Sequence, residues 1–151
     1  QSGDSIMPDV RTVILIAHRR MEKALLKLMQ KERRVFENYR LLSTQETGEV
    51  IERELGFEVT SVFPARRGGE IQLCGLVCSN SIAAVYFLRD PIGAAGDEPD
   101  IHPFYRACDL NSVPLATNLV TAVAVTQWLG RKLADEAEEP GNAETDDPVV
   151  A

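Results

Sequence analysis

One histidine and several carboxylates stand at positions from which side chains can move a proton. His18 directly follows an apolar run, Glu70 follows two glycines, and Asp90 ends the most apolar run of the chain. Asp100 stands at the start of an expected helix, where an N-cap is the more plausible role for this residue taken alone. A histidine grouped with carboxylates is suited to proton transfer beside a carbonyl group. The simpler alternatives are that His18 is a structural hydrogen-bond donor and that Asp90 caps a turn.

Gly68 and Gly69 allow the backbone to approach a ligand closely. They precede an expected helix, and a helix N-terminus without side chains in the way is a favourable place for an anion. Glu70 lies in the first turn of that helix, where the helix dipole stabilises a carboxylate. This placement favours either a base or a cap.

The elements that must position these residues alternate between strand and helix patterns. The apolar periodicity predicts strands at 12–17, 40–42, 58–63, 82–88 and 113–116, and helices at 21–36, 47–55, 70–79, 100–110 and 118–133. Parallel strands need crossover connections, so this alternation predicts a three-layer α/β/α sandwich with a five-stranded parallel sheet. Ligands of such sheets bind beyond the carboxyl ends of the strands, where the residues named above are expected.

Length and charge predict one domain with two flanking segments. A chain of 151 residues with 44% hydrophobic residues supports one ordinary core. We expect a disordered segment at 1–9, the folded domain at 10–133 and an acidic disordered tail at 134–151. After Lys132 the chain carries seven acidic side chains and no basic one, which is typical of a solvated tail. A docking role is the alternative for this tail.

Composition also argues against several classes of protein. A net charge of −7 without a basic stripe argues against nucleic-acid binding. No apolar run approaches the roughly 20 residues that span a bilayer, and the first residues lack a secretion signal, so we expect no membrane partner and a cytoplasmic location. Cys74, Cys78 and Cys108 fit reduced apolar positions, and no metal site is predicted.

Five motifs in order resemble the methylglyoxal synthase family. They are VILIAH at 13–18, T-x-x-T-G at 44–48, Gly68-Gly69-Glu70 with Gln72, Asp90-Pro91 with Pro99-Asp100, and PLATN at 114–118. The resemblance extends from about Val10 to Trp128. It implies a homo-oligomer, usually a hexamer, and a lyase without metal or organic cofactor. In the family reaction a carboxylate removes a carbon-bound proton from dihydroxyacetone phosphate, an enediol phosphate forms, and phosphate leaves to give methylglyoxal.

The resemblance also assigns roles to individual residues. Glu70 falls at the catalytic base, where the family has aspartate. Asp90 and Asp100 match family aspartates, and His18 matches a histidine that contacts a substrate oxygen. Substrate binding is expected from Thr44, Thr47, Gly68 and Gly69, and also from Arg19, Arg66 and Arg67, which are not family residues and would replace the lost phosphate contacts.

Several family positions are altered, however. Arg19 replaces an aspartate, Glu22 a phosphate-binding lysine, and Glu46 a phosphate-gripping threonine. Pro64-Ala65-Arg66 replaces Ser-Gly-Pro, and Asp97 replaces a histidine. Carboxylates oppose a dianionic phosphate, so we expect the family activity to be weak or lost.

New arginines accompany these losses and have two interpretations. They are Arg19, Arg20, Arg66, Arg67 and Arg89. They either pair with Glu22 and Glu46 and close the old site, or form a new anion site, because arginine binds phosphate or carboxylate with two parallel hydrogen bonds. The second interpretation makes the chain a non-catalytic binding or sensing module for a small phosphorylated or carboxylated metabolite. A purely structural role is a further alternative.

Overall fold

A parallel sheet of five strands organises the chain. The computed structural model describes residues 11–79 and 81–138. The strands are β1 (Thr12–Ala17), β2 (Arg40–Ser43), β3 (Thr60–Ser61), β4 (Ile82–Leu88) and β5 (Leu115–Ala116). Their order across the sheet is β3-β2-β1-β4-β5, and every pair of neighbours is parallel. The predicted five-stranded parallel sheet is therefore confirmed.

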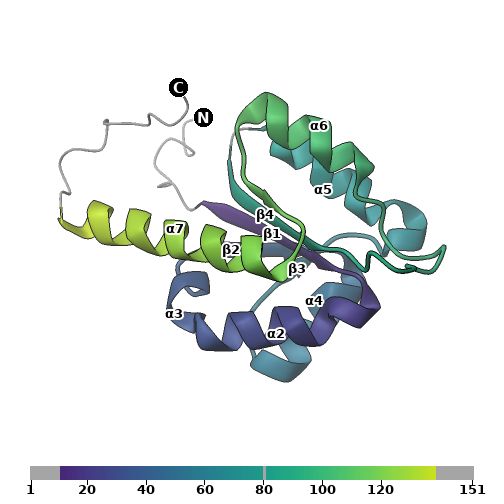
Figure 1. The fold of residues 1–151 in the computed structure, drawn as a ribbon, viewed down its shortest axis with the longest axis horizontal. Helices are drawn as coiled ribbons and strands as arrows, with labels where there is room; N and C mark the ends of the chain where they lie inside the picture. Colours follow the sequence, from purple (N-terminus) through teal and green to yellow (C-terminus); the bar gives the residue numbers. More distant parts are fainter. Residues whose placement is uncertain (1–10, 80, 139–151) are drawn as a thin grey trace.

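Helices cover both faces of this sheet (Figure 1). They are η1 (Arg19–Met21), α2 (Glu22–Lys31), α3 (Arg33–Phe36), α4 (Gln45–Leu55), η2 (Ala65–Arg67), α5 (Gly69–Val77), α6 (His102–Asn111) and α7 (Leu119–Glu138). Helices α5 and α6 pack on one face, and α2, α3, α4 and α7 pack on the other. The α/β/α sandwich predicted from the sequence is thus the observed fold.

The central strand β1 shows how one short run supplies two cores. Successive side chains of a strand point to opposite faces. Val13 and Leu15 accordingly join the core under α2, α3, α4 and α7, whereas Ile14 and Ile16 join the core under α5 and α6. All residues of β1 and β4 are buried, as expected for strands covered on both faces.

A predicted helix and a predicted strand were wrong in their extent. The helix predicted at 21–36 breaks at Glu32, whose backbone leaves the helical region (φ −108°, ψ 34°). Apolar spacing missed the break because Leu28 and Phe36 on its two sides bury against the same core. The strand predicted at 58–63 contains only β3, because this edge strand has a single neighbour and pairs over two residues.

The last helix corrects a domain boundary. Helix α7 continues to Glu138, so residues 134–138 are helical and do not belong to the predicted tail. Their acidic side chains are exposed, and an exposed helical turn needs no apolar residue to continue. The predicted segment 1–9 and residues 139–151 lie outside the described residues. Within 11–79 and 81–138, no helix has the length and apolarity to cross a membrane.

A buried tyrosine provides a test of the packing between β4 and α7. The Tyr86 hydroxyl donates to Thr126 Oγ1 at 2.6 Å, and that hydroxyl donates in turn to the Ala122 carbonyl at 2.8 Å. Burial raises the pKa of Tyr86. We expect Tyr86→Phe to lower the free energy of unfolding in urea by about 1 kcal/mol, the usual net value of one hydrogen bond. Tyr105→Phe, at a side chain 42% exposed, should change it little, and equal effects would contradict this account.

Candidate active site at the carboxyl ends of the strands

The chain segment between β4 and α6 lines an open cavity beyond the carboxyl ends of β1 and β4. The cavity has a volume of about 350 Å³. It is lined by His18, Arg89, Asp90, Pro91, Ile92, Gly93, Ala94, Ala95, Glu98, Pro99, Asp100, Ile101 and His102. The structure therefore brings together three of the four residues predicted to be catalytic, and the fourth, Glu70, contacts the same segment.

His18 joins the two ends of this segment. Its buried ring accepts a hydrogen bond at Nδ1 from the Asp90 backbone N–H at 2.8 Å. Nδ1 therefore carries no proton, so Nε2 carries one and donates it to the Pro99 carbonyl at 2.8 Å. The ring also packs edge-on against Phe87, with centroids 5.4 Å apart. Both ring nitrogens are engaged by backbone, so contact of His18 with a substrate oxygen requires that the Pro99 bond be exchanged.

Asp90 is a buried cap of the turn that follows β4. Its Oδ1 accepts from the backbone N–H of Ile92 at 3.0 Å and of Gly93 at 3.4 Å. Its Oδ2 lies 3.8 Å from Arg20 Nε. The turn-capping alternative raised from the sequence thus describes the observed contacts, and a substrate role for Asp90 stays a prediction.

Asp100 has an exposed side chain that faces His102. Its Oδ1 lies 2.7 Å from His102 Nδ1 and accepts the His102 backbone N–H at 3.2 Å. These two hydrogen bonds, the side-chain one first, lower the pKa of Asp100. Asp100 therefore stays ionised at neutral pH and is better suited to accept a hydrogen bond than to donate a proton.

Glu70 is a buried carboxylate with one unpartnered oxygen. Its Oε2 accepts the Asp100 backbone N–H at 3.0 Å. Its Oε1 is buried and has no hydrogen-bond partner among the described residues. A fixed carboxylate with one oxygen free of hydrogen bonds can act as a base once a substrate reaches that oxygen.

Two glycines bring Glu70 to this position. Gly68 has φ 87°, which only glycine adopts readily. Gly69 leaves no space for a side chain, because a Cβ there would lie 1.9 Å from the Phe63 carbonyl oxygen. The backbone turns tightly at these two residues and begins α5 with Glu70 in its first turn.

Thr44 and Thr47 lie at the start of α4, beside the end of β1. Both are buried, and Thr47 Oγ1 accepts the Ala17 backbone N–H at 3.2 Å. Glu46 in the same helical turn extends to the loop before the paired glycines, where its Oε1 accepts the Ala65 backbone N–H at 3.2 Å. The Glu46 carboxylate thus accepts a hydrogen bond from a backbone N–H group that would otherwise be available to a ligand.

Arg19 binds acidic side chains of the segment that covers the cavity. Its guanidinium lies 2.9 Å from Asp97 Oδ1 and 3.5 Å from Glu98 Oε2, and its backbone N–H donates to Glu98 Oε1 at 3.2 Å. One interpretation of the new arginines was that they pair with Glu22 and Glu46. The ion-pair partners of Arg19 are instead Asp97 and Glu98, and Glu22 acts on Arg19 only at longer range.

Three carboxylates lie near one another beside Arg19. Burial raises the pKa of Glu22, and the negative charges of Glu98 and Glu46 raise it further. The positive charges of Arg19 and Arg53 lower it, but the net shift is upward. The sequence had suggested Glu22 and Glu46, but Glu98 was missed. Its only sequence signal was its place in an acidic loop at the end of a buried strand.

The two arginines of η2 do not form a joint anion site in this structure. The guanidinium of Arg67 lies over the Phe63 ring, 4.5 Å from its centroid. Arg66 is close enough to Asp97 to help lower the pKa of that carboxyl. Their predicted role in substrate binding stays a prediction.

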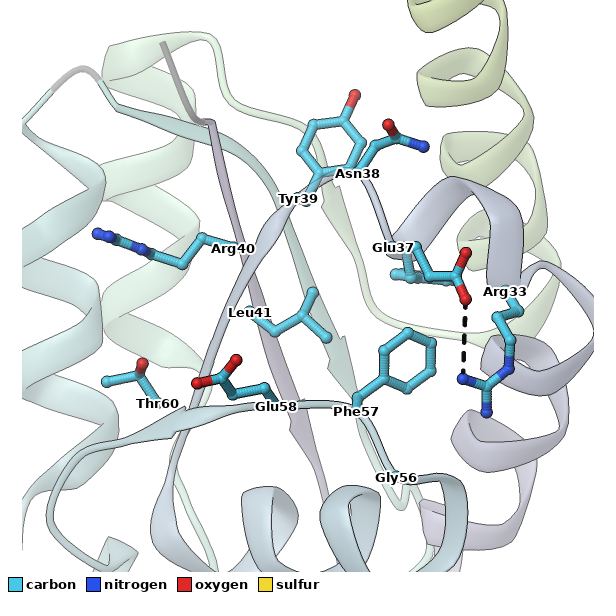
Figure 2. Close-up of a pocket in the computed structure, with 11 residues that line it drawn as sticks. Arg33, Glu37, Asn38, Tyr39, Arg40, Leu41, Gly56, Phe57, Glu58 and Thr60 are labelled. Atoms are coloured by element: carbon cyan, nitrogen blue, oxygen red, sulfur yellow. Dashed lines mark ion pairs between the residues drawn. The ribbon is translucent and has the colours of Figure 1, made fainter. Parts of the chain in front are cut away.

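A larger hollow lies at the opposite end of the strands, near the start of β2 and β3 (Figure 2). Its volume is about 610 Å³, and it contains none of the predicted site residues. Arg33, at its rim, donates to the Leu55 carbonyl at 2.7 Å, lies 3.9 Å from Glu37, and covers the Phe57 ring. Because it contains none of the residues that the sequence assigns to the site, this hollow is the weaker candidate for the functional site.

The fold and the site define a three-layer α/β domain with a charged cleft at the carboxyl ends of its strands. Methylglyoxal synthase of Thermoanaerobacter sp. is 33% identical over 126 residues, 83% of this chain and 96% of that protein. The synthase of Thermus thermophilus is 35% identical over 120 residues, 80% of this chain and 95% of that protein. No protein-family model matches the sequence. On these similarities, the chain belongs to the methylglyoxal synthase family.

Two further comparisons extend this result. The crystal structure of methylglyoxal synthase from Elizabethkingia anophelis NUHP1 superposes with a TM-score of 0.74 at 31% identity, covering 80% of this chain and 79% of that one. An uncharacterized protein of Synechocystis sp. is 40% identical over 119 residues, 79% of this chain. The chain spans only 28% of the length of that protein.

Proposed function

We propose that this chain eliminates phosphate from dihydroxyacetone phosphate weakly or not at all. The observation that supports this proposal most directly is the hydrogen bond from the Ala65 backbone N–H to Glu46 Oε1 at 3.2 Å. By the family resemblance, Glu46 replaces a threonine that grips phosphate, and Ala65 lies in the segment before the paired glycines. The chain's own carboxylate takes up a donor in the region where a substrate phosphate would bind.

The charges around Glu22 also oppose the binding of a phosphate. Glu22 replaces a phosphate-binding lysine, and Glu46 and Glu98 lie close enough to raise its pKa. Two unit charges about 4 Å apart interact by roughly 4 kcal/mol at the effective dielectric of a protein surface. A dianionic phosphate placed among these carboxylates loses binding free energy on that scale, and Arg19 is already engaged by Asp97 and Glu98.

The residues that would handle the proton are present, although Glu70 stands where the family has aspartate. Glu70 Oε1 is buried and unpartnered, so Glu70 can accept a carbon-bound proton from a substrate that reaches it. His18 and Asp90 would orient a substrate oxygen after a rearrangement of their bonds to the covering segment. Residual elimination, if measured, is therefore assigned to Glu70.

The second candidate function is binding of a small anionic metabolite without turnover. Its supporting observation is Arg89, which lines the 350 Å³ cavity and whose buried Nε has no hydrogen-bond partner among the described residues. A ligand that binds only the folded protein raises its melting temperature, so thermal stabilisation by small anions distinguishes this function from a purely structural one.

The deciding experiment is an assay of methylglyoxal and phosphate formed from dihydroxyacetone phosphate by the purified chain. We expect kcat/KM at least about 1,000-fold below that of the Thermus thermophilus synthase, since the loss of two close charge contacts has this effect. Glu70→Gln is the matched control, because it keeps the shape of the side chain and removes the base. Turnover comparable to the synthase that disappears in Glu70→Gln would refute the proposal and establish a lyase.

We also propose a homo-oligomer, a hexamer by the family resemblance, in the cytoplasm. Exposed apolar side chains support association: Val120 on α7 is 80% exposed and Ile71 on α5 is 61% exposed. Light scattering coupled to size-exclusion chromatography measures the number of subunits. A monomer at all concentrations would contradict this part of the proposal.

A further inference from the structure

Most of the charged side chains that line the cavity beside the segment between β4 and α6 have partners within the protein. Asp90 is held by two backbone N–H groups and approached by Arg20, Glu98 binds Arg19, and Asp100 binds His102. Arg89 is the exception, because no ion pair or side-chain hydrogen bond joins it to any residue within 11–79 and 81–138. Asp90, Glu98 and Asp100 each have a hydrogen-bond or ion-pair partner, whereas the side chain of Arg89 has none among the described residues.

The position of Arg89 is fixed by the sheet. Arg89 directly follows β4, the second central strand, and its backbone N–H donates to the Thr117 carbonyl at 3.2 Å beyond the end of β5. Arg89 is among the residues that line the cavity, and its Nε is buried without an acceptor among the described residues. A buried N–H of a charged group without an acceptor is unfavourable, and a bound oxyanion removes that penalty.

We propose that Arg89 is the binding residue of an oxyanion site for a small carboxylate metabolite. This inference deepens the proposed function, since it names the ligand class that the cleft takes in place of a triose phosphate. Once the side chain turns enough to expose its buried Nε, the guanidinium can donate from Nε–H and an Nη–H in the parallel arrangement that matches two carboxylate oxygens. The cavity of about 350 Å³ admits a small metabolite.

The surrounding charges favour a carboxylate over a phosphate. Asp90, Glu98 and Asp100 line the same cavity, and each repels a bound anion. A phosphate dianion meets this repulsion with twice the charge of a carboxylate, whereas both gain the same pair of hydrogen bonds. The cavity therefore favours a singly charged anion over a doubly charged one.

The test follows the Arg89 Nε–H signal by NMR of the full ¹⁵N-labelled chain. The signal is assigned as the one missing from Arg89→Gln. Acetate should shift it saturably, whereas chloride at equal ionic strength should not, and phosphate should bind more weakly than acetate. Backbone signals of residues 89–102 should report acetate binding that is about tenfold or more weaker in Arg89→Gln, the effect of losing charged hydrogen bonds. Arg106→Gln, which removes the same charge from the exposed face of α6, should bind acetate normally.

Each result decides the inference independently of turnover. An Arg89 signal that acetate leaves unmoved, or that chloride moves equally, would overturn the site. Tighter binding of phosphate than of acetate would overturn the ligand class. Rapid turnover of dihydroxyacetone phosphate would refute the proposed loss of activity and leave this titration unchanged, so the two failures are distinguishable.

Discussion

The double variant Glu22→Lys with Glu46→Thr should eliminate phosphate from dihydroxyacetone phosphate at least about 100-fold faster than the native chain, measured as kcat/KM. Glu46→Thr removes the carboxylate that binds the Ala65 backbone N–H and frees that donor. Glu22→Lys puts a cation in place of a carboxylate. Burial and nearby acids raise the pKa of that carboxylate in the native chain. A few kcal/mol of charge interaction correspond to two or more orders of magnitude in rate.

Two controls separate this effect from a change of net charge. Glu49→Lys with Glu54→Thr changes the charge of the chain by the same amount on exposed positions of α4 and should leave turnover at the native value. Glu70→Gln added to the double variant should abolish the gained activity, because Glu70 supplies the base. A double variant that folds yet gains nothing would show that these two carboxylates are not what limits the site.

The strands could be predicted from the sequence because parallel strands buried on both faces leave continuous apolar runs. The bounds predicted for the runs at 12–17 and 82–88 are those of β1 and β4. The break at Glu32 was missed because the residues on both sides of it contribute to one core, so the apolar spacing continues across it. Periodicity reports which side is buried and says little about where a helix is interrupted.

The location of the site was predictable, but its contacts were not. The strand-end rule placed His18 and Asp90 in one region, and the structure confirms that both line one cavity. Their partners come from the path of the segment between β4 and α6, which follows no periodic pattern. The bonds from His18 to Pro99 and from Arg19 to Asp97 join residues 81 and 78 positions apart, and only the folded chain brings them together.

Gly69→Ala should lower the free energy of unfolding by about 3 kcal/mol or more, at the upper end of single substitutions. The Cβ of alanine would lie 1.9 Å from the Phe63 carbonyl oxygen and 3.2 Å from that of Pro64, and neither backbone atom can move without shifting the loop. Gly75→Ala lies in the same helix with nothing within 4 Å of the new Cβ, so it should stabilise the protein by about 0.5 to 1 kcal/mol. Urea unfolding measures both. Equal effects of the two substitutions would contradict the close approach at Gly69, and with it the backbone turn that holds Glu70 against the Asp100 backbone N–H.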